Sequence, residues 1–209
     1  MILGIDFDNT IIRYDELFHR IAVEQGLIPE TVLKEKNAVR DYLRRMNQED
    51  KWTRLQGEVY GKRILEAVPY DGMKEALSEL SKLGIPVYIV SHKTRMPYIG
   101  EPCDLHQAAI GWLKMEGFCS TSGLNCSEEK FIFEESKTAK VQRIIELGCT
   151  HYIDDLPEIL EMLPETVEKI LFAPTGDARK NGYGAWHMMH SWCELPAILQ
   201  IHPKPALKK

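Results

Sequence analysis

The first ten residues contain the most chemically informative spacing in the chain. A short apolar run of strand length leads to Asp6, Asp8 and Thr10 at alternating positions. In an extended strand, residues i and i+2 share a face, so we expect the two carboxylates to point the same way. Two carboxylates that lie close together raise each other's pKa unless a cation compensates them. The pattern predicts a metal site or an acid/base pair, although Asp-Asn-Thr is also common turn and N-cap chemistry.

Polar side chains follow three later strand-like runs as well. In an open parallel sheet, ligands bind outside the carboxyl ends of the strands, so these positions are candidates for one shared site. Taken singly, each has an ordinary explanation: Ser91 as a turn residue, Lys137 as a solvated charge, and Asp155 as a helix N-cap with Glu158. The segments, in chain order, are Ser91-His92-Lys93-Thr94, Ser136-Lys137 and Asp154-Asp155.

Strand-like and helical patterns alternate along most of the chain. Between the strand-like runs, apolar residues recur at helical spacing, and Gly84 and Gly148 are stop signals for two of the helices. This alternation predicts an α/β fold, a Rossmann-like parallel sheet with helices on both faces. The expected strands cover 85–90, 130–134, 151–153 and 169–173, and the expected helical faces cover 73–80, 105–112 and 141–145.

One long stretch, from about Tyr14 to Tyr70, contains helical patterns and no convincing strand. Three apolar patterns at helical spacing fall within it, over 17–22, 32–46 and 52–59. Three consecutive helices are more than one crossover connection usually needs. We therefore predict a small all-α cap domain, inserted into the sheet domain. The alternative is that these helices pack directly on the sheet. The predicted boundaries are 15–69 for the cap and 1–14 with 70–209 for the core domain.

Composition and charge limit the class of protein. The 209-residue chain is 44% hydrophobic and 27% charged, as is typical of a globular protein, and its net charge is −5. The acidic balance argues against nucleic acid as a partner. The first apolar run is too short for a signal peptide or a membrane span, so we expect no membrane association. Five cysteines without a paired metal spacing predict reduced thiols in a cytoplasmic protein. Nothing in the sequence indicates the oligomeric state.

Taken together, the motifs resemble those of the haloacid dehalogenase-like (HAD) hydrolase superfamily, in the same order along the chain. The segment DFDNT resembles the first motif, DxDxT, with Asn9 at a place where glycine is common. Ser91 resembles the second motif, Lys137 the third, and Asp154-Asp155 the fourth. The predicted cap falls where many members insert one, between the first two motifs. The resemblance covers the core domain and implies the HAD-like fold.

The resemblance also implies roles for the carboxylates. Asp6 is the expected nucleophile, which forms an aspartyl-phosphate. Mg²⁺ is expected on the Asp6 carboxylate, the Asp8 main-chain carbonyl and a carboxylate of the fourth motif, with Asp155 preferred over Asp154. Asp8 is the expected general acid/base. Dehalogenase members lack a carboxylate two residues after the nucleophile, so Asp8 favours phosphoryl transfer over halide release.

Other residues are expected to contact the substrate. Ser91 would bond a phosphoryl oxygen, and Lys137 would offset the negative charge of Asp6 and the phosphate. Lys140 competes for this role, and Lys137 is preferred because it lies just past a strand end. A lysine that opens a helix also opposes the helix dipole, which points to a ligand. The expected phosphate- and substrate-binding residues are Thr10, Ser91, His92, Lys93, Arg95 and, from the cap, Arg54. Trp52 and Tyr60 either face the leaving group or pack inside the cap.

The expected function is that of a Mg²⁺-dependent phosphohydrolase acting on a small phosphorylated metabolite. Two alternatives stay open. One is a phosphomutase or phosphotransferase that uses the same site, and the other is a non-catalytic module that binds a phosphorylated ligand. The Asp8 carboxylate speaks against the module, because binding alone does not need it.

Overall fold

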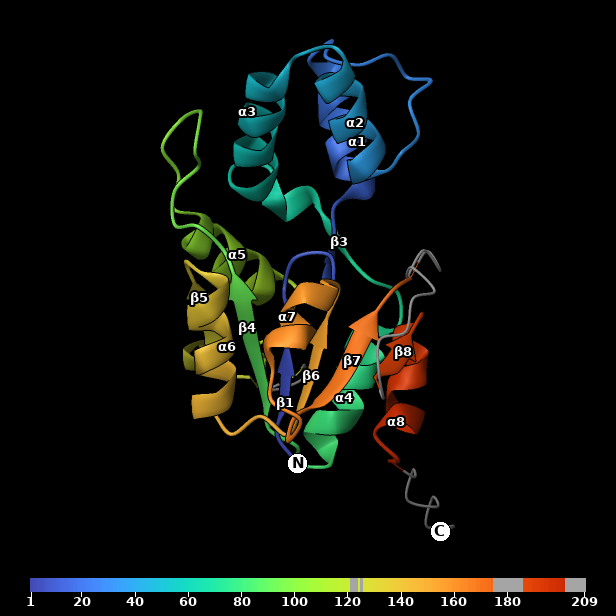
Figure 1. Cartoon of the computed structure of the whole chain (residues 1–209), viewed down its shortest axis with the longest axis vertical. Coiled ribbons are helices and arrows are strands. Elements are labelled where there is room, and N and C mark those ends of the chain that lie inside the picture. The colour runs from blue at the N-terminus through green and yellow to red at the C-terminus, as the bar shows by residue number, and fades with distance from the viewer. Residues whose placement is uncertain (121–123, 125, 175–185, 202–209) are drawn as a thin grey trace.

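A six-stranded sheet is the main feature of the computed structural model, which describes residues 1–120, 124, 126–174 and 186–201 (Figure 1). All neighbouring strands in it are parallel, in the order β5-β4-β1-β6-β7-β8. The four strands expected after residue 80 are confirmed as β4 to β7, and the three-residue β8 is an addition too short for its pattern to be recognised. The strands are β1 (Leu3–Ile5), β4 (Val87–His92), β5 (Phe131–Glu134), β6 (His151–Asp154), β7 (Glu168–Phe172) and β8 (His187–Met189).

Helices cover both faces of this sheet. Successive residues of a strand point to opposite faces, and the buried residues divide accordingly. Ile89 and Ile153 belong to one apolar cluster, whereas their neighbours Val90 and Tyr152 belong to a second. The first cluster includes side chains from α4 (Met73–Lys82), α5 (Leu105–Met115) and α8 (Leu195–Ile198), and the second from α6 (Lys137–Glu146) and α7 (Pro157–Met162). The predicted Rossmann-like α/β architecture is therefore confirmed.

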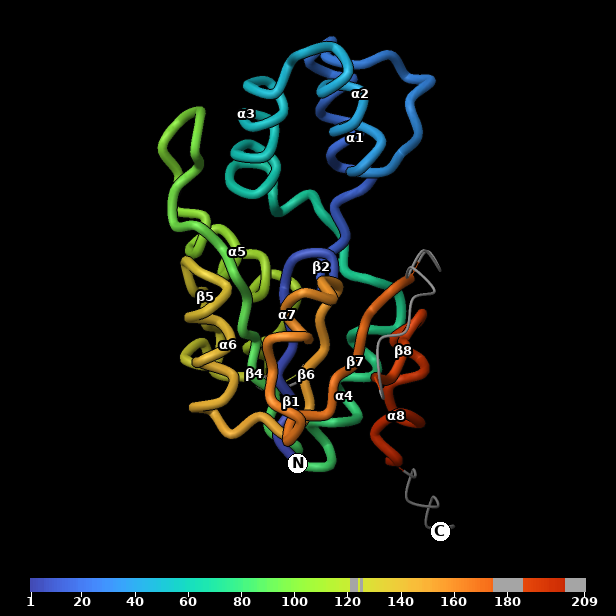
Figure 2. Tube along the Cα trace, viewed as in Figure 1, coloured from blue at the N-terminus to red at the C-terminus, as the bar shows by residue number. Residues whose placement is uncertain are grey.

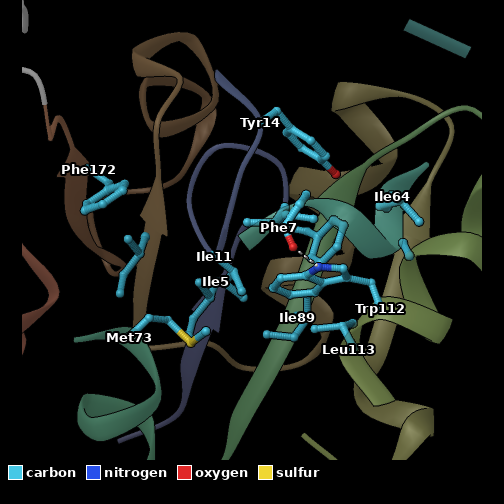
Figure 3. Packing of buried hydrophobic residues seen from close by; sticks show 14 of the residues in the cluster. Ile5, Phe7, Ile11, Tyr14, Ile64, Met73, Ile89, Trp112, Leu113 and Phe172 are labelled. Carbon is cyan, nitrogen blue, oxygen red and sulfur yellow. Dashed lines mark hydrogen bonds between the residues drawn. The ribbon is translucent and has the colours of Figure 1, made fainter. Parts of the chain in front are cut away.

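The larger apolar cluster packs directly beneath the first motif (Figure 3). The ring of Phe7 lies edge-on to Trp112, with 5.6 Å between ring centroids. The Trp112 indole Nε1 donates a hydrogen bond to the carbonyl of Ala67, 2.9 Å away, so this buried polar atom is satisfied. Phe7 lies between Asp6 and Asp8 in the sequence, and its burial therefore anchors the backbone that carries both carboxylates.

Three further helices lie beyond the carboxyl ends of the strands, where Figures 1 and 2 show them away from either face of the sheet. They are α1 (Asp15–Glu24), α2 (Lys36–Arg45) and α3 (Glu49–Tyr60), and we refer to them as the helical unit. Phe18 and Trp52 stack inside it with 5.0 Å between ring centroids, so Trp52 is a packing residue. Two short antiparallel strands, β2 (Ile12–Arg13) and β3 (Val68–Pro69), connect the unit to the sheet. The boundaries of a separate cap domain stay a prediction.

Two glycines let α3 approach the segment that follows β4. A Cβ atom on Gly57 would lie 2.9 Å from the Cβ of Pro97, and one on Gly61 would lie 3.0 Å from the Sγ of Cys103. Cβ contacts under 3.0 Å are essentially never seen, so a side chain at position 57 would force a shift, and one at position 61 would require Cys103 to move slightly. The helical unit is therefore packed closely against the 97–105 segment.

The remaining elements are short. The chain forms 3-10 turns at Ile64–Glu66, Glu128–Lys130 and Trp192–Glu194. All five cysteines are free thiols, as expected from their spacing. Within the described residues, no helix is both long enough and apolar enough to cross a bilayer.

Candidate active site

Asp6 lies where β1 ends, between the ends of β4 and β6. Its backbone N–H donates to the carbonyl of Ile153, 2.9 Å away, which extends the β1–β6 pairing by one residue. The side chain is only 4% exposed. Its Oδ1 accepts hydrogen bonds from Ser91 Oγ at 2.8 Å and from Lys140 Nζ at 2.6 Å. Among the described residues nothing donates to Oδ2, which leaves this oxygen available to a ligand.

Lys140 links two of the carboxylates. Its ammonium lies 2.6 Å from Asp6 Oδ1 and 2.7 Å from Asp154 Oδ2, and its side chain is 1% exposed. Burial alone would lower the pKa of Lys140, but the two carboxylates outweigh burial and raise it, so the ammonium is charged. Removing one member of a buried ion pair typically costs about 3–5 kcal/mol, because the partner is left uncompensated.

The expectation that Lys137 lies at the site is corrected by these contacts. Lys137 opens α6, its side chain is 42% exposed, and it pairs with Glu158 of α7. Both lysines lie on the side of α6 that faces the site, so periodicity does not separate them. Their positions along the helix axis separate them, because each residue advances a helix by about 1.5 Å and Lys140 lies three residues after Lys137. Lys140 therefore reaches Asp6 at the end of β1, whereas Lys137 pairs with Glu158.

Asp154 and Asp155 complete an acidic cluster with Asp6. One carboxylate oxygen from each of the three residues lies within 4.8 Å of the others. Both Asp154 oxygens are engaged, Oδ1 by the backbone N–H of Leu156 at 2.9 Å and Oδ2 by Lys140. In the part of the chain that the structure describes, no hydrogen bond or ion pair engages the Asp155 carboxylate. Asp155 is also not a helix cap, since α7 begins at Pro157 without a side-chain cap.

This cluster fits a divalent cation. Burial raises the pKa of Asp155, and the carboxylates of Asp154 and Asp6 raise it further. Such mutual repulsion is what a bound Mg²⁺ would relieve, and carboxylate oxygens are its usual protein ligands. The unengaged oxygens belong to Asp6 and Asp155, which agrees with the preference for Asp155 as the ligand and with an orienting role for Asp154.

Asp8 is held by two donors that face it from different segments. Lys93 Nζ lies 2.9 and 2.8 Å from the two carboxylate oxygens, and Tyr14 donates its hydroxyl to Oδ1 at 2.6 Å. Lys93 is only 5% exposed, and its contact with the substrate stays a prediction. Burial and then the Asp8 charge raise the pKa of Tyr14, which keeps its hydroxyl protonated as a donor. Both contacts fix the orientation of the Asp8 carboxylate.

The backbone conformation of the turn after Asp8 explains why asparagine is found at position 9. Asn9 has a φ of 59°, in the left-handed region that favours glycine and that asparagine tolerates best among other residues. Thr10 is fully buried, and its carbonyl accepts a hydrogen bond from Trp192 Nε1 at 3.1 Å. Its Oγ1 has no hydrogen-bond partner among the described residues. A phosphate contact by Thr10 stays a prediction.

Three other predicted substrate residues lie apart from the carboxylates. The His92 ring contacts the carbonyl of Glu135 at 3.3 Å, and Arg95, with 62% of its side chain exposed, pairs with Asp104. Arg54 is exposed on α3. Within the described residues, none of the three forms a hydrogen bond or ion pair with the acidic cluster. Their roles in substrate binding remain predictions.

The helical unit supplies residues that the sequence analysis missed or left open. The Tyr60 ring lies beneath two ammonium groups, with Lys93 Nζ 4.6 Å and Lys36 Nζ 5.5 Å from its centroid. Tyr60 therefore faces the site. Lys36 opens α2 without an acidic residue in the first turn. A lysine at this position opposes the helix dipole, and this was the available signal for a role outside the helix.

The comparisons with known proteins agree with this architecture. No protein-family model matches the chain. A protein of Oceanobacillus iheyensis named "Putative nucleotidase" is 24% identical over 178 residues, which cover 82% of this chain and 85% of that protein. A dehalogenase crystal structure with an intermediate complex matches at a TM-score of 0.58 and 14% identity, over 94% of this chain and 96% of that one.

Two further solved structures come from named organisms. A HAD family hydrolase from Deinococcus radiodurans, with bound phosphate and sodium, matches at a TM-score of 0.57 and 16% identity, over 95% of this chain and 94% of that one. A predicted phosphoglycolate phosphatase from Haemophilus somnus matches at a TM-score of 0.54 and 13% identity, over 95% of this chain and 97% of that one. At these identities the likeness is one of fold. The resemblance read from the motifs is confirmed at that level: this chain has the fold of the HAD-superfamily hydrolases.

Proposed function

We propose that this chain is a Mg²⁺-dependent phosphohydrolase that acts on a small phosphorylated metabolite through an aspartyl-phosphate on Asp6. The observation that carries the proposal is the Asp6 carboxylate itself. Ser91 and Lys140 fix its Oδ1, no described residue donates to its Oδ2, and the carboxylate shares a cluster with Asp155. A nucleophile needs this combination of a fixed orientation and one free oxygen.

In the first step, an oxygen of the Asp6 carboxylate attacks phosphorus and the bond from phosphorus to the leaving oxygen breaks. Asp8 gives the leaving oxygen a proton, so the product departs as an alcohol. In the second step, Asp8 takes a proton from water, the water oxygen attacks phosphorus, and inorganic phosphate leaves with Asp6 restored. Lys93 and Tyr14 hold the Asp8 carboxylate where both proton transfers require it.

Charge is the main obstacle, because a carboxylate must approach a phosphate dianion. Lys140 supplies one fixed positive charge at the attacking group. Mg²⁺, held by Asp6 and Asp155 when bound, would supply further neutralisation and orient the phosphoryl oxygens. Asp154 would position the Asp155 backbone and Lys140 without losing its own contacts.

The choice of phosphate esters over haloacids depends on Asp8. Displacement of a halide needs no general acid, because halide leaves without a proton. A carboxylate fixed by two donors beside the nucleophile is useful when the leaving group is an alkoxide. The names of the Oceanobacillus and Haemophilus proteins, a nucleotidase and a phosphoglycolate phosphatase, support phosphate monoesters as the substrate class.

The test is hydrolysis of an aryl phosphate with and without Mg²⁺, followed by a panel of phosphorylated metabolites. Wild type should release inorganic phosphate, and Asp6→Asn should lose at least about 10⁴-fold of the activity, as expected when a nucleophile is removed. Transfer of phosphate to a second metabolite instead of water would show that the protein is a phosphotransferase. Equal turnover by wild type and Asp6→Asn would overturn it.

A further inference from the structure

Lys36 lies at the start of α2, and its ammonium is close to Tyr60, an aromatic residue that also contacts Lys93 in the site. Its backbone N–H donates to Asp15 Oδ1 at 2.8 Å, which ties the start of α2 to the start of α1. Its ammonium lies 5.5 Å from the Tyr60 ring centroid and 5.9 Å from that of Phe18. The residue is half-buried. The backbone contact and the two rings together fix the direction of this side chain.

The charge of Lys36 lacks a partner of its own. Elsewhere in the site, Lys140 is paired with two carboxylates and Lys93 with one. Within the described ranges, the Lys36 ammonium forms no ion pair, although it interacts with the Tyr60 side chain. Burial lowers the pKa of Lys36, but Tyr60 and the more distant Asp155 and Asp8 raise it on balance, so the group is charged.

The position of Lys36 is costly for the helix that carries it. A cation in the first turn opposes the helix macrodipole, and α2 has no acidic residue there to compensate. The ammonium lies against two aromatic rings, and no carboxylate of the described residues pairs with it. A charged lysine kept in this place without one is suited to an anion that arrives with the substrate.

We propose that Lys36 binds a phosphoryl oxygen of the substrate, so that the helical unit completes the phosphate site from the side opposite Lys140. The inference builds on the proposed function and assigns a further substrate-binding residue to the same site. Lys36 Nζ lies 5.5 Å from the Tyr60 ring centroid, and the ammonium of Lys93, which pairs with Asp8, lies 4.6 Å from the same centroid, so we expect the phosphoryl group near Asp8 and Asp155.

The test measures binding separately from turnover. Inorganic phosphate is titrated calorimetrically into wild type, Lys36→Met, Lys36→Arg and Lys51→Met in the presence of Mg²⁺. Lys51 is an exposed lysine of α3 and serves as the matched control. Lys36→Met should raise the Kd for phosphate at least about tenfold, the loss expected for a charge-assisted hydrogen bond. Lys36→Arg should stay within about threefold of wild type, and Lys51→Met should match it.

Kinetics with an aryl phosphate provide the second readout. Lys36→Met should raise KM by a similar factor with kcat less affected, whereas a purely structural role would lower Tm and leave KM unchanged. A Kd for phosphate equal to that of wild type in Lys36→Met would overturn the inference, as would no phosphate binding by wild type. If Lys36→Met does not fold, Lys36→Gln replaces it. Wild type that binds phosphate through Lys36 but hydrolyses nothing would overturn the proposed function and leave this inference standing.

Discussion

Asp6, Lys140 and Asp154 lie at the carboxyl edge of the sheet, whereas Lys36 and Tyr60 reach the same site from the helical unit. We call the first group the floor of the site and the second the roof. In the floor, each charge is matched by an opposite charge within 2.7 Å, and the register of three parallel strands sets the positions. In the roof, one ammonium contacts aromatic rings and pairs with no carboxylate in the described residues.

The difference shows how the two groups divide the work of the site. A floor of buried, mutually paired charges is pre-organised, so it suits the chemical step, which needs fixed geometry. In the roof, the Lys36 ammonium has no carboxylate partner among the residues that the structure describes, so it can bind an anionic ligand. Chemistry is therefore expected to depend on the floor and substrate choice on the roof. The following predictions test that division, starting with the largest effect.

Breaking the floor should have the largest effect. Lys140→Met removes the cation from between Asp6 and Asp154, and we expect kcat to fall by about 10²–10³-fold, as when one transition-state donor is lost. The free energy of unfolding at pH 7 should fall by about 3 kcal/mol, since two buried carboxylates lose their partner. Lys137→Met, three residues away on the same helix, is the matched control and should change kcat less than about threefold. A larger effect at Lys137 than at Lys140 would refute this arrangement.

Metal dependence tests the role of Asp155, which lies in the acidic cluster with Asp6 and Asp154. Chelation with EDTA should abolish activity, and added Mg²⁺ should restore it. Asp155→Asn should raise the Mg²⁺ concentration for half-maximal activity by about 100-fold, because it removes an unengaged ligand oxygen. Glu158→Gln, three residues along, should leave the Mg²⁺ response unchanged. An unaltered Mg²⁺ titration in Asp155→Asn would show that Asp155 is not a ligand.

The hydrogen bond from the Tyr14 hydroxyl to Asp8 is expected to contribute to catalysis, and its removal tests that contribution. Tyr14→Phe removes one of the two side chains that hold Asp8 and leaves Lys93 in place. We expect kcat to fall by about tenfold, the usual scale for a hydrogen bond to a charged group. The pH–rate profile of this variant should shift relative to wild type, because Asp8 is the proposed acid/base. Tyr42→Phe, in the helical unit, is the control. Identical profiles for all three proteins would remove Tyr14 from the mechanism.

The smallest effect concerns an exposed ion-pair group at the base of the helical unit. Hydrogen bonds from Arg63 and Arg20 lower the pKa of Glu66 from 4.5 to about 2. A lowered pKa means that the stabilising contribution is present above about pH 4.5 and is lost as the pH falls toward 2. Solvent screening limits it to less than about 1 kcal/mol. Glu66→Gln should therefore unfold slightly more easily than wild type at pH 7, and the difference should shrink at pH 3 in denaturant titrations.

Much of the floor could be predicted from the sequence. Strand ends in a parallel sheet meet at one edge, so Asp6, Ser91 and Asp154 could be brought together from their positions in apolar runs. The choice between Lys137 and Lys140 could not be made in this way. Strand boundaries read from a sequence are uncertain by a residue or two, and one helical turn decided which lysine reached Asp6.

The roof was harder to predict. Its residues come from helices whose tilt over the sheet depends on packing between units, and the local pattern does not contain that information. Trp52 and Tyr60 are both aromatic residues of α3, yet one packs inside the unit and the other faces the site. The sequence does contain a signal for Lys36, because a cation at the start of a helix opposes the helix dipole and so indicates a role outside the helix. The same signal at Lys137 marked a residue that pairs on the surface with Glu158.

The β2–β3 ribbon has a consequence for how such a molecule can change. Ile12 is the register partner of Pro69, so the chain departs for the three helices and returns from them at adjacent points. Antiparallel partners lie about 5 Å apart, a gap that a two-residue turn can close. We therefore expect that the intervening segment can be exchanged while the sheet below keeps its strand register, and that such an exchange would change which substrates bind.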